Sequence, residues 1–217
     1  MSTVVITVRG QAESRTAPEI ATLHVSVEFD GTERAGVTER ALRLGEVVRG
    51  EIEQLVSSGA VSEWSSDQLS VWSSRPWNDD GEQLPLVHTA SLTFRVVFAG
   101  LSKLSGWVSA IVEREGVKIG GITWDVTLES RKQIERDTAG QAIADAVERA
   151  SAYARAIGKK TVTPVQIADV GLLQDSSAES AGLKLARATA YSGGTNVTLR
   201  PEPVVVSAAV EVRFEAE

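Results

Sequence analysis

Residues Ser130–Gly158 read SRKQIERDTAGQAIADAVERASAYARAIG, and this stretch decides how the 217-residue chain packs. From position 134 to position 157, alanine stands at almost every second or third residue. A long helix with so many small side chains can lie very close to another backbone. The spacing of Ser130 and Gln133 fits a helix-capping box. The stripe predicted to face the interior consists of Ala139, Ile143, Ala146, Ala150, Tyr153 and Ile157.

Outside this helix, the period of apolar residues predicts both strands and further helices. Apolar steps of three and four predict helices near 33–58 and 101–111, with Gly59 and Gly116 closing them. Gly45 and Gly50 each cost the first of these helices about 1 kcal/mol relative to alanine, and we expect close packing there. Alternation predicts strands at 4–8, 21–29, 86–98, 122–128, 164–173 and 204–214, and residues 10–18 are expected as a polar connection.

Alternation with one polar face is typical of antiparallel or mixed sheets. The fold class predicted is therefore α+β, an antiparallel or mixed β-sheet packed against about three α-helices. The length fits one large or two small domains, and a single domain over residues 1–217 is expected. The polar stretch 174–203 is predicted to be a mobile segment.

Composition excludes several classes of function. With 22 basic and 29 acidic residues, the net charge of −7 repels phosphate backbones and anionic membranes, so no nucleic-acid partner is expected. The absence of cysteine excludes disulfides and zinc–thiolate sites but leaves the compartment undecided. No stretch approaches the roughly 18 apolar residues of a membrane span. The first residues do not form a signal peptide, which favours a cytoplasmic location.

Few residues suggest chemistry. His24 and His88 are the only histidines, and a solvated or hydrogen-bonded structural role is the default for each. The acidic loop of Asp79, Asp80 and Glu82 lacks the calcium-loop pattern and is interpreted as an ordinary turn. Gly120-Gly121 is interpreted as a bend or bulge in a strand. We therefore predict no catalytic residue, no metal site and no cofactor.

Tryptophan is unusually frequent, with five residues against two tyrosines and four phenylalanines. Three of the five lie between positions 64 and 77, beside an arginine, and such residues are enriched at the centres of interfaces. Simple filling of the core is the alternative, and the sequence leaves both open. The interaction candidates are Trp64, Trp72, Arg75, Trp77 and His88.

Several segments, taken in order, resemble the SIMPL domain family over about residues 3–215. Its beginning is similar to Ile6–Gly10 followed by Pro18–Ala21, and its middle to Phe98–Leu101 and Glu115–Trp124. Its alanine-rich helix and final strand are similar to Ala142–Gly158 and Leu199–Phe214. The chain departs from the family pattern at Glu19, at His88–Ala90 and at Arg200–Glu202.

The resemblance implies a bacterial domain of unknown function, without an agreed catalytic residue or cofactor. Bacterial relatives are often exported, and some assemble into large ring-like or channel-like oligomers. An animal relative is described as an adaptor that binds a signalling kinase. These properties favour a non-enzymatic structural or interaction protein that self-associates into a homo-oligomer or binds an unidentified protein partner. The alternatives are a small-ligand binding protein, with a pocket between sheet and helices lined by Trp72, Trp77 or His88, and, third, an enzyme.

Overall fold

The structure, a computed structural model, describes residues 3–78, 80–173 and 199–217. Within these residues the chain forms three helices and two antiparallel sheets, which confirms the predicted α+β class. Contacts divide the chain into two compact units, called unit 1 and unit 2 below. Of the described residues, unit 1 comprises 3–17, 126–173 and 203–217, and unit 2 comprises 18–78, 80–125 and 199–202.

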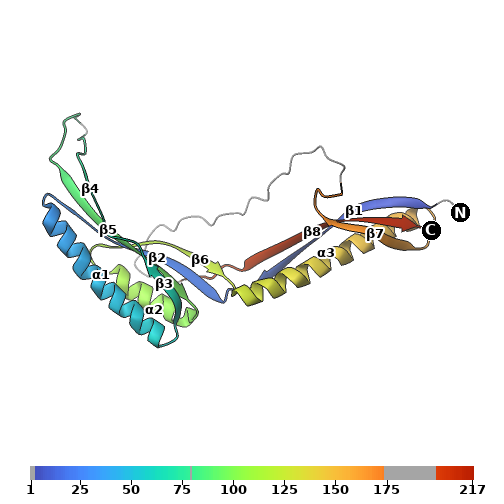
Figure 1. The fold of residues 1–217 in the computed structure, drawn as a ribbon, viewed down its shortest axis with the longest axis horizontal. Helices are drawn as coiled ribbons and strands as arrows, with labels where there is room; N and C mark the ends of the chain where they lie inside the picture. The colour runs from blue at the N-terminus through green and yellow to red at the C-terminus, as the bar shows by residue number, and fades with distance from the viewer. Residues whose placement is uncertain (1–2, 79, 174–198) are drawn as a thin grey trace. The chain divides into compact units, whose positions relative to one another are not determined.

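Unit 1 is a three-stranded sheet, sheet A, with one long helix against it (Figure 1). Its strands follow the order β1–β8–β7, and both pairings are antiparallel. Helix α3 packs mainly on β1 and β8 and makes few contacts with β7. The elements are β1 (Val4–Thr16), α3 (Leu128–Ala156), β7 (Val162–Asp169) and β8 (Val204–Ala216).

The buried face of α3 carries smaller side chains than the sequence pattern predicted. It repeats every four residues and consists of Thr138, Ala142, Ala146, Ala150 and Ala154. Ala146 and Ala150 confirm the prediction, but Ile143, Tyr153 and Ile157 are exposed, which makes the prediction wrong for them. The capping box is also wrong, because the helix begins earlier and the Thr127 side chain accepts the Ser130 N–H at 3.3 Å.

Alanine is required because the backbones of β1 and α3 approach closely at Gly10. A Cβ atom on Gly10 would lie 1.9 Å from the Ala142 carbonyl oxygen and 2.8 Å from the Ala146 Cβ. This close approach was the packing that the alanine-rich stretch predicted. The polar connection expected at residues 10–18 is wrong, because β1 pairs with β8 without interruption from Val4 to Thr16.

Unit 2 contains the second sheet, sheet B, in the order β3–β5–β2–β6, with β4 also paired to β5. Helices α1 and α2 lie alongside this sheet (Figure 1), and their buried apolar residues share one core with it. The elements are β2 (Ile20–Gly31), α1 (Arg34–Ser57), β3 (Val61–Ser66), β4 (Ser70–Ser74), β5 (Val87–Phe98), α2 (Leu101–Val112) and β6 (Val117–Asp125).

The core of unit 2 is built from large side chains, and Phe94, Phe98, Leu23, Ile52 and Leu104 are fully buried in it. Both predicted helices are confirmed, and Gly59 and Gly116 have positive φ angles after their ends. A Cβ on Gly45 would meet the Leu92 side chain at 2.6 Å, as expected, whereas Gly50 has open space around it, so the prediction is wrong there. The bulge predicted at Gly120-Gly121 is confirmed by a register shift opposite His24 and Val25.

Three expectations are not decided by this architecture. The mobile segment predicted at 174–203 falls mostly on residues 174–198, which lie outside the described residues. The single domain over residues 1–217 stays a prediction. So does the cytoplasmic location. Of the described helices, none is long and apolar enough to cross a membrane.

Candidate functional site

The predicted interaction residues all lie on β3, β4, the loop that follows β4, and the start of β5. Trp64, on β3, is half-buried and its ring centroid lies 6.5 Å from that of Phe94, so it belongs to the core of unit 2. Trp72 on β4 is 46% exposed, and Trp77 in the loop is 66% exposed. Trp64 therefore fills the core, whereas the role of the exposed Trp72 and Trp77 in an interface stays a prediction.

Residues 70–91, called the β4–β5 hairpin below, present the exposed pair. The loop of the hairpin is held by its own polar groups: Trp77 and Gln83 form an isolated bridge, and the Leu84 N–H donates to the Pro76 carbonyl at 2.8 Å. Leu84 and Leu86 are also exposed, at 39% and 37%. The described part of the loop is thus an ordered turn that carries apolar side chains into solvent.

Of the acidic residues of this loop, Glu82 takes part in a turn with Asn78, and Asp79 lies outside the described residues. The Asn78 side chain accepts the Glu82 N–H at 2.7 Å and donates to the Glu82 carboxylate at 3.1 Å, and Gly81 has φ +78°. This is the ordinary turn that the sequence predicted. In the described parts of the chain, no group of three or more acidic, histidine or cysteine side chains is arranged to hold a metal ion.

His88 and Arg75 differ in their surroundings. His88 is half-buried, and its Nδ1 atom lies 2.6 Å from the Ser73 Oγ across the β4–β5 pairing. Among the described contacts, no third group bonds to the imidazole ring. Arg75 is exposed in the loop one residue after β4. His24 is exposed on sheet B and opposite Gly121.

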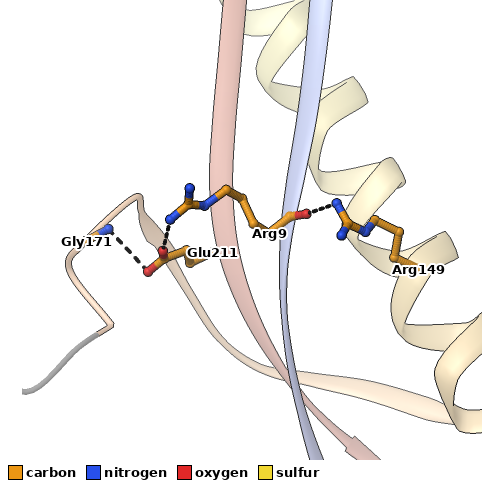
Figure 2. Close-up of polar contacts among 4 residues, drawn as sticks. All are labelled: Arg9, Arg149, Gly171 and Glu211. Atoms are coloured by element: carbon orange, nitrogen blue, oxygen red, sulfur yellow. Dashed lines mark hydrogen bonds and ion pairs between the residues drawn. The ribbon is translucent and has the colours of Figure 1, made fainter. Parts of the chain in front are cut away.

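A second polar cluster, on sheet A, was not found from the sequence. Arg9 and Glu211 lie directly opposite each other on β1 and β8, with Arg9 Nη2 2.9 Å from Glu211 Oε1 (Figure 2). The Gly171 N–H donates to the other carboxylate oxygen at 3.2 Å. The hydrogen bond from Arg9 is the largest cause that holds the pKa of the buried Glu211 below its usual range, while burial acts in the opposite direction.

The same cluster covers part of the outer edge of β1. Arg149 on α3 donates to the Arg9 carbonyl at 2.8 Å, and Asp145 one turn earlier accepts the Gln11 N–H at 2.9 Å (Figure 2 shows the Arg149 contact). These backbone groups flank Gly10 and are the ones that an added strand would use. Free strand edges promote unwanted pairing, so α3 protects β1 at the point of closest helix contact.

A shallow cavity of about 480 Å³ adjoins this cluster. Its wall includes three guanidinium groups and one carboxylate, those of Arg9, Arg149, Arg213 and Glu211. Arg9 is paired with Glu211, Arg149 bonds the backbone, and Arg213 donates to Gln166 Oε1 at 3.1 Å. The arginines are thus engaged in holding strands and helix together, and the cluster has the chemistry of a structural network.

The fold defined here is an α+β protein with a small alanine-packed unit and a larger unit that carries an exposed tryptophan hairpin. The family model of SIMPL, described as a protein of unknown function (DUF541), matches residues 6–214. The chain therefore belongs to the SIMPL family, as the resemblance indicated. No curated protein matches the sequence.

Proposed function

We propose that this SIMPL protein is a non-enzymatic structural or interaction protein that self-assembles into a homo-oligomer through its β4–β5 hairpin. The observation that carries the proposal is the exposure of Trp72 and Trp77, at 46% and 66%, on one ordered hairpin. Tryptophan is among the residues that most often dominate the binding energy of an interface. Leu84 and Leu86 of the same hairpin are also exposed, and Arg75 lies between the two tryptophans in the sequence.

A second copy of the chain is the occupant that the hairpin suits best. Strand β4 pairs with β5 on one side, and no other described strand pairs with its opposite edge. An isologous dimer places the same patch of both copies against itself, and an antiparallel β4–β4 contact satisfies this condition. Assembly of relatives into large oligomers, which the family resemblance implies, supports the same choice.

The non-enzymatic part of the proposal rests on the contacts of the hairpin. His88 is bonded to Ser73, without a third group that orients it among the described residues. The alternative function, a ligand pocket between sheet and helices, has less support, because Trp72 and Trp77 are exposed on the hairpin and large side chains fill the described interior of unit 2.

The experiment is size-exclusion chromatography with light scattering across micromolar concentrations. The wild type is expected to exceed the 23.1 kDa monomer, and the double variant Trp72→Ser/Trp77→Ser is expected to shift to the monomer. Leu128→Ser is the matched control, because Leu128 is 69% exposed but lies on α3. A monomeric wild type would overturn self-assembly, and a double variant that stays oligomeric would place the interface away from the hairpin.

A further inference from the structure

A groove of about 400 Å³ lies between α1 and α2 of unit 2, separate from the hairpin and from the Arg9–Glu211 cluster. Helix α1 contributes Glu51 and Leu55 to its wall, and helix α2 with the turn after it contributes Lys103, Trp107 and Arg114. Small-molecule sites are typically clefts of roughly 300–1,000 Å³ with mostly apolar walls and a few converging polar groups. The volume of this open groove falls in that range, and Leu55, Trp107 and Ala110 give it an apolar part.

The polar groups of the groove are fixed by one another. The Glu51 carboxylate accepts a hydrogen bond from the Trp107 Nε1–H at 3.2 Å on one oxygen, and from Arg114 Nη2 on the other. Trp107 is also fixed from its other side, because its ring lies 5.5 Å from that of Phe98 between centroids. The indole and the guanidinium are therefore held in place before any ligand arrives.

Arg114 has one buried nitrogen atom, Nη1, without a hydrogen-bond partner among the described residues. A buried donor without an acceptor costs about 1–3 kcal/mol, and a charged one costs more, so native proteins seldom leave one without a reason. The Arg114 side chain lines the groove and is about a third exposed, so its positive charge can attract an oxygen from outside the chain while Nη2 stays on Glu51.

The net positive charge of the groove favours a negatively charged oxygen over a neutral one. Arg114 and Lys103 carry two positive charges against the single negative charge of Glu51, in a chain whose net charge is −7. Hydrogen bonds between a guanidinium and a carboxylate are stronger than those to a neutral oxygen. Trp107 and Leu55 offer an apolar surface beside these charges.

We propose that the α1–α2 groove binds a small monocarboxylate with an apolar or aromatic body, its carboxylate on Arg114 and Lys103 and its body against Trp107 and Leu55. The proposal does not depend on self-assembly, since no residue of the hairpin takes part. Glu51 acts as a positioning residue that orients Arg114 and Trp107. The proposed site gives the chain a ligand-binding activity in addition to its proposed structural role.

The test is a titration of the full-length protein with phenylacetate, followed by the indole N–H signals of the five tryptophans in heteronuclear NMR spectra. The Trp107 signal, assigned with a Trp107→Phe variant, is expected to shift and saturate in the millimolar range. The neutral analogue phenylacetamide is expected to bind at least roughly tenfold more weakly, because it lacks the charge that the two basic side chains favour.

Two variants and a control separate binding from folding. Arg114→Gln is expected to weaken phenylacetate binding at least roughly tenfold, and Lys103→Gln, at an exposed position, to weaken it less while the protein stays folded. Arg43→Gln is the control, since Arg43 is exposed elsewhere on α1 and pairs with Glu39. An unmoved Trp107 signal, equal binding of the amide, or unchanged binding by both groove variants would overturn the proposal.

Discussion

Both units of this protein pack helices on a β-sheet, but they use side chains of different size to do so. In unit 1 the helix contributes alanines and the sheet contributes the volume, with Phe214 and Val212 fully buried against α3. In unit 2 helices and sheet both contribute large side chains to one core, such as Ile52 and Leu104 from the helices and Phe94 from the sheet. The first arrangement brings two backbones together, and the second keeps them apart with buried bulk.

The difference teaches which kind of substitution each unit tolerates least. A core of large side chains loses most when a side chain is truncated, because the lost contacts leave a cavity. A core in which backbones touch loses most when a side chain is enlarged, because neither backbone can yield. All five tryptophans, at 64, 72, 77, 107 and 124, lie in unit 2. Tryptophan fluorescence therefore reports on unit 2, and circular dichroism reports on both units.

The largest effect is expected from truncation in unit 2. Phe94 is 1% exposed and packs against Trp64, so Phe94→Ala should lower the free energy of unfolding by about 3–5 kcal/mol. Urea unfolding followed by circular dichroism, which reports on both units, measures this change. The comparison in unit 1 is Ala150→Gly, which removes one methyl group and should cost about 1 kcal/mol, mainly through helix propensity. Equal losses for the two variants would contradict the contrast between the units.

Substitution by a larger side chain should be costly in the core of unit 1, where the backbones of α3 and β1 approach closely. Ala146 is fully buried and its Cβ lies near Gly10, so Ala146→Leu is expected to destabilise the protein by about 1–3 kcal/mol. The neighbouring Val147→Leu is the control, because Val147 is 39% exposed and has room for one more carbon. Thermal unfolding is followed by circular dichroism. If the melting temperature of Ala146→Leu equals that of the control, the close approach of α3 and β1 is wrong.

The same experiment shows how the units unfold. A shift seen by circular dichroism but not by tryptophan fluorescence would mean that unit 1 unfolds independently of unit 2. A common shift in both signals would mean that one cooperative transition covers the whole chain, as the single-domain prediction requires. Either result sharpens the comparison, because the stability of each unit could then be assigned to its own type of core.

Sequence patterns predicted the strands and helices well where one face alternates clearly with the other. The strand at 204–214 is an example, because Val206, Val210, Val212 and Phe214 are buried as alternation predicted. The buried face of α3 was harder to predict. A hydrophobic pattern favours Ile143, Tyr153 and Ile157, yet the approach of Gly10 leaves room only for alanine. The side-chain volume allowed at a contact depends on the partner backbone, which the pattern of one segment does not contain.

The candidate site residues also depend on contacts that the pattern of one segment does not contain. Tryptophan frequency identified the hairpin, but only the pairing of β4 with β5 separates the half-buried Trp64 from the exposed Trp72 and Trp77. Arg9 and Glu211 are 202 positions apart and meet through the register of β1 and β8. Each looks like an ordinary polar residue on an alternating strand. A charge pair across a sheet could be found from sequence only if the register were known.

The smallest effect is expected at the ion pair of unit 1. Because the pKa of Glu211 is lowered in the folded protein, its ionised form stabilises the fold. This contribution is complete above the pKa of an ordinary glutamate and is lost as the pH falls through the lower folded value. Glu211→Gln should therefore cost about 1 kcal/mol at pH 7 and progressively less under acid conditions. Unfolding free energies measured between pH 7 and pH 3 test this difference.

Glu215→Gln on the same strand is the control for this pH dependence, since Glu215 is exposed four residues further along β8. Its stability curve should run parallel to that of the wild type, whereas the curve of Glu211→Gln should converge with the wild type at low pH. Parallel curves for both variants would mean that the pair of Arg9 and Glu211 contributes no more than a surface contact. In that case the stability of unit 1 would come from the packing of the α3 alanines on sheet A and not from the ion pair. The two units would then differ fully in the type of core that stabilises them.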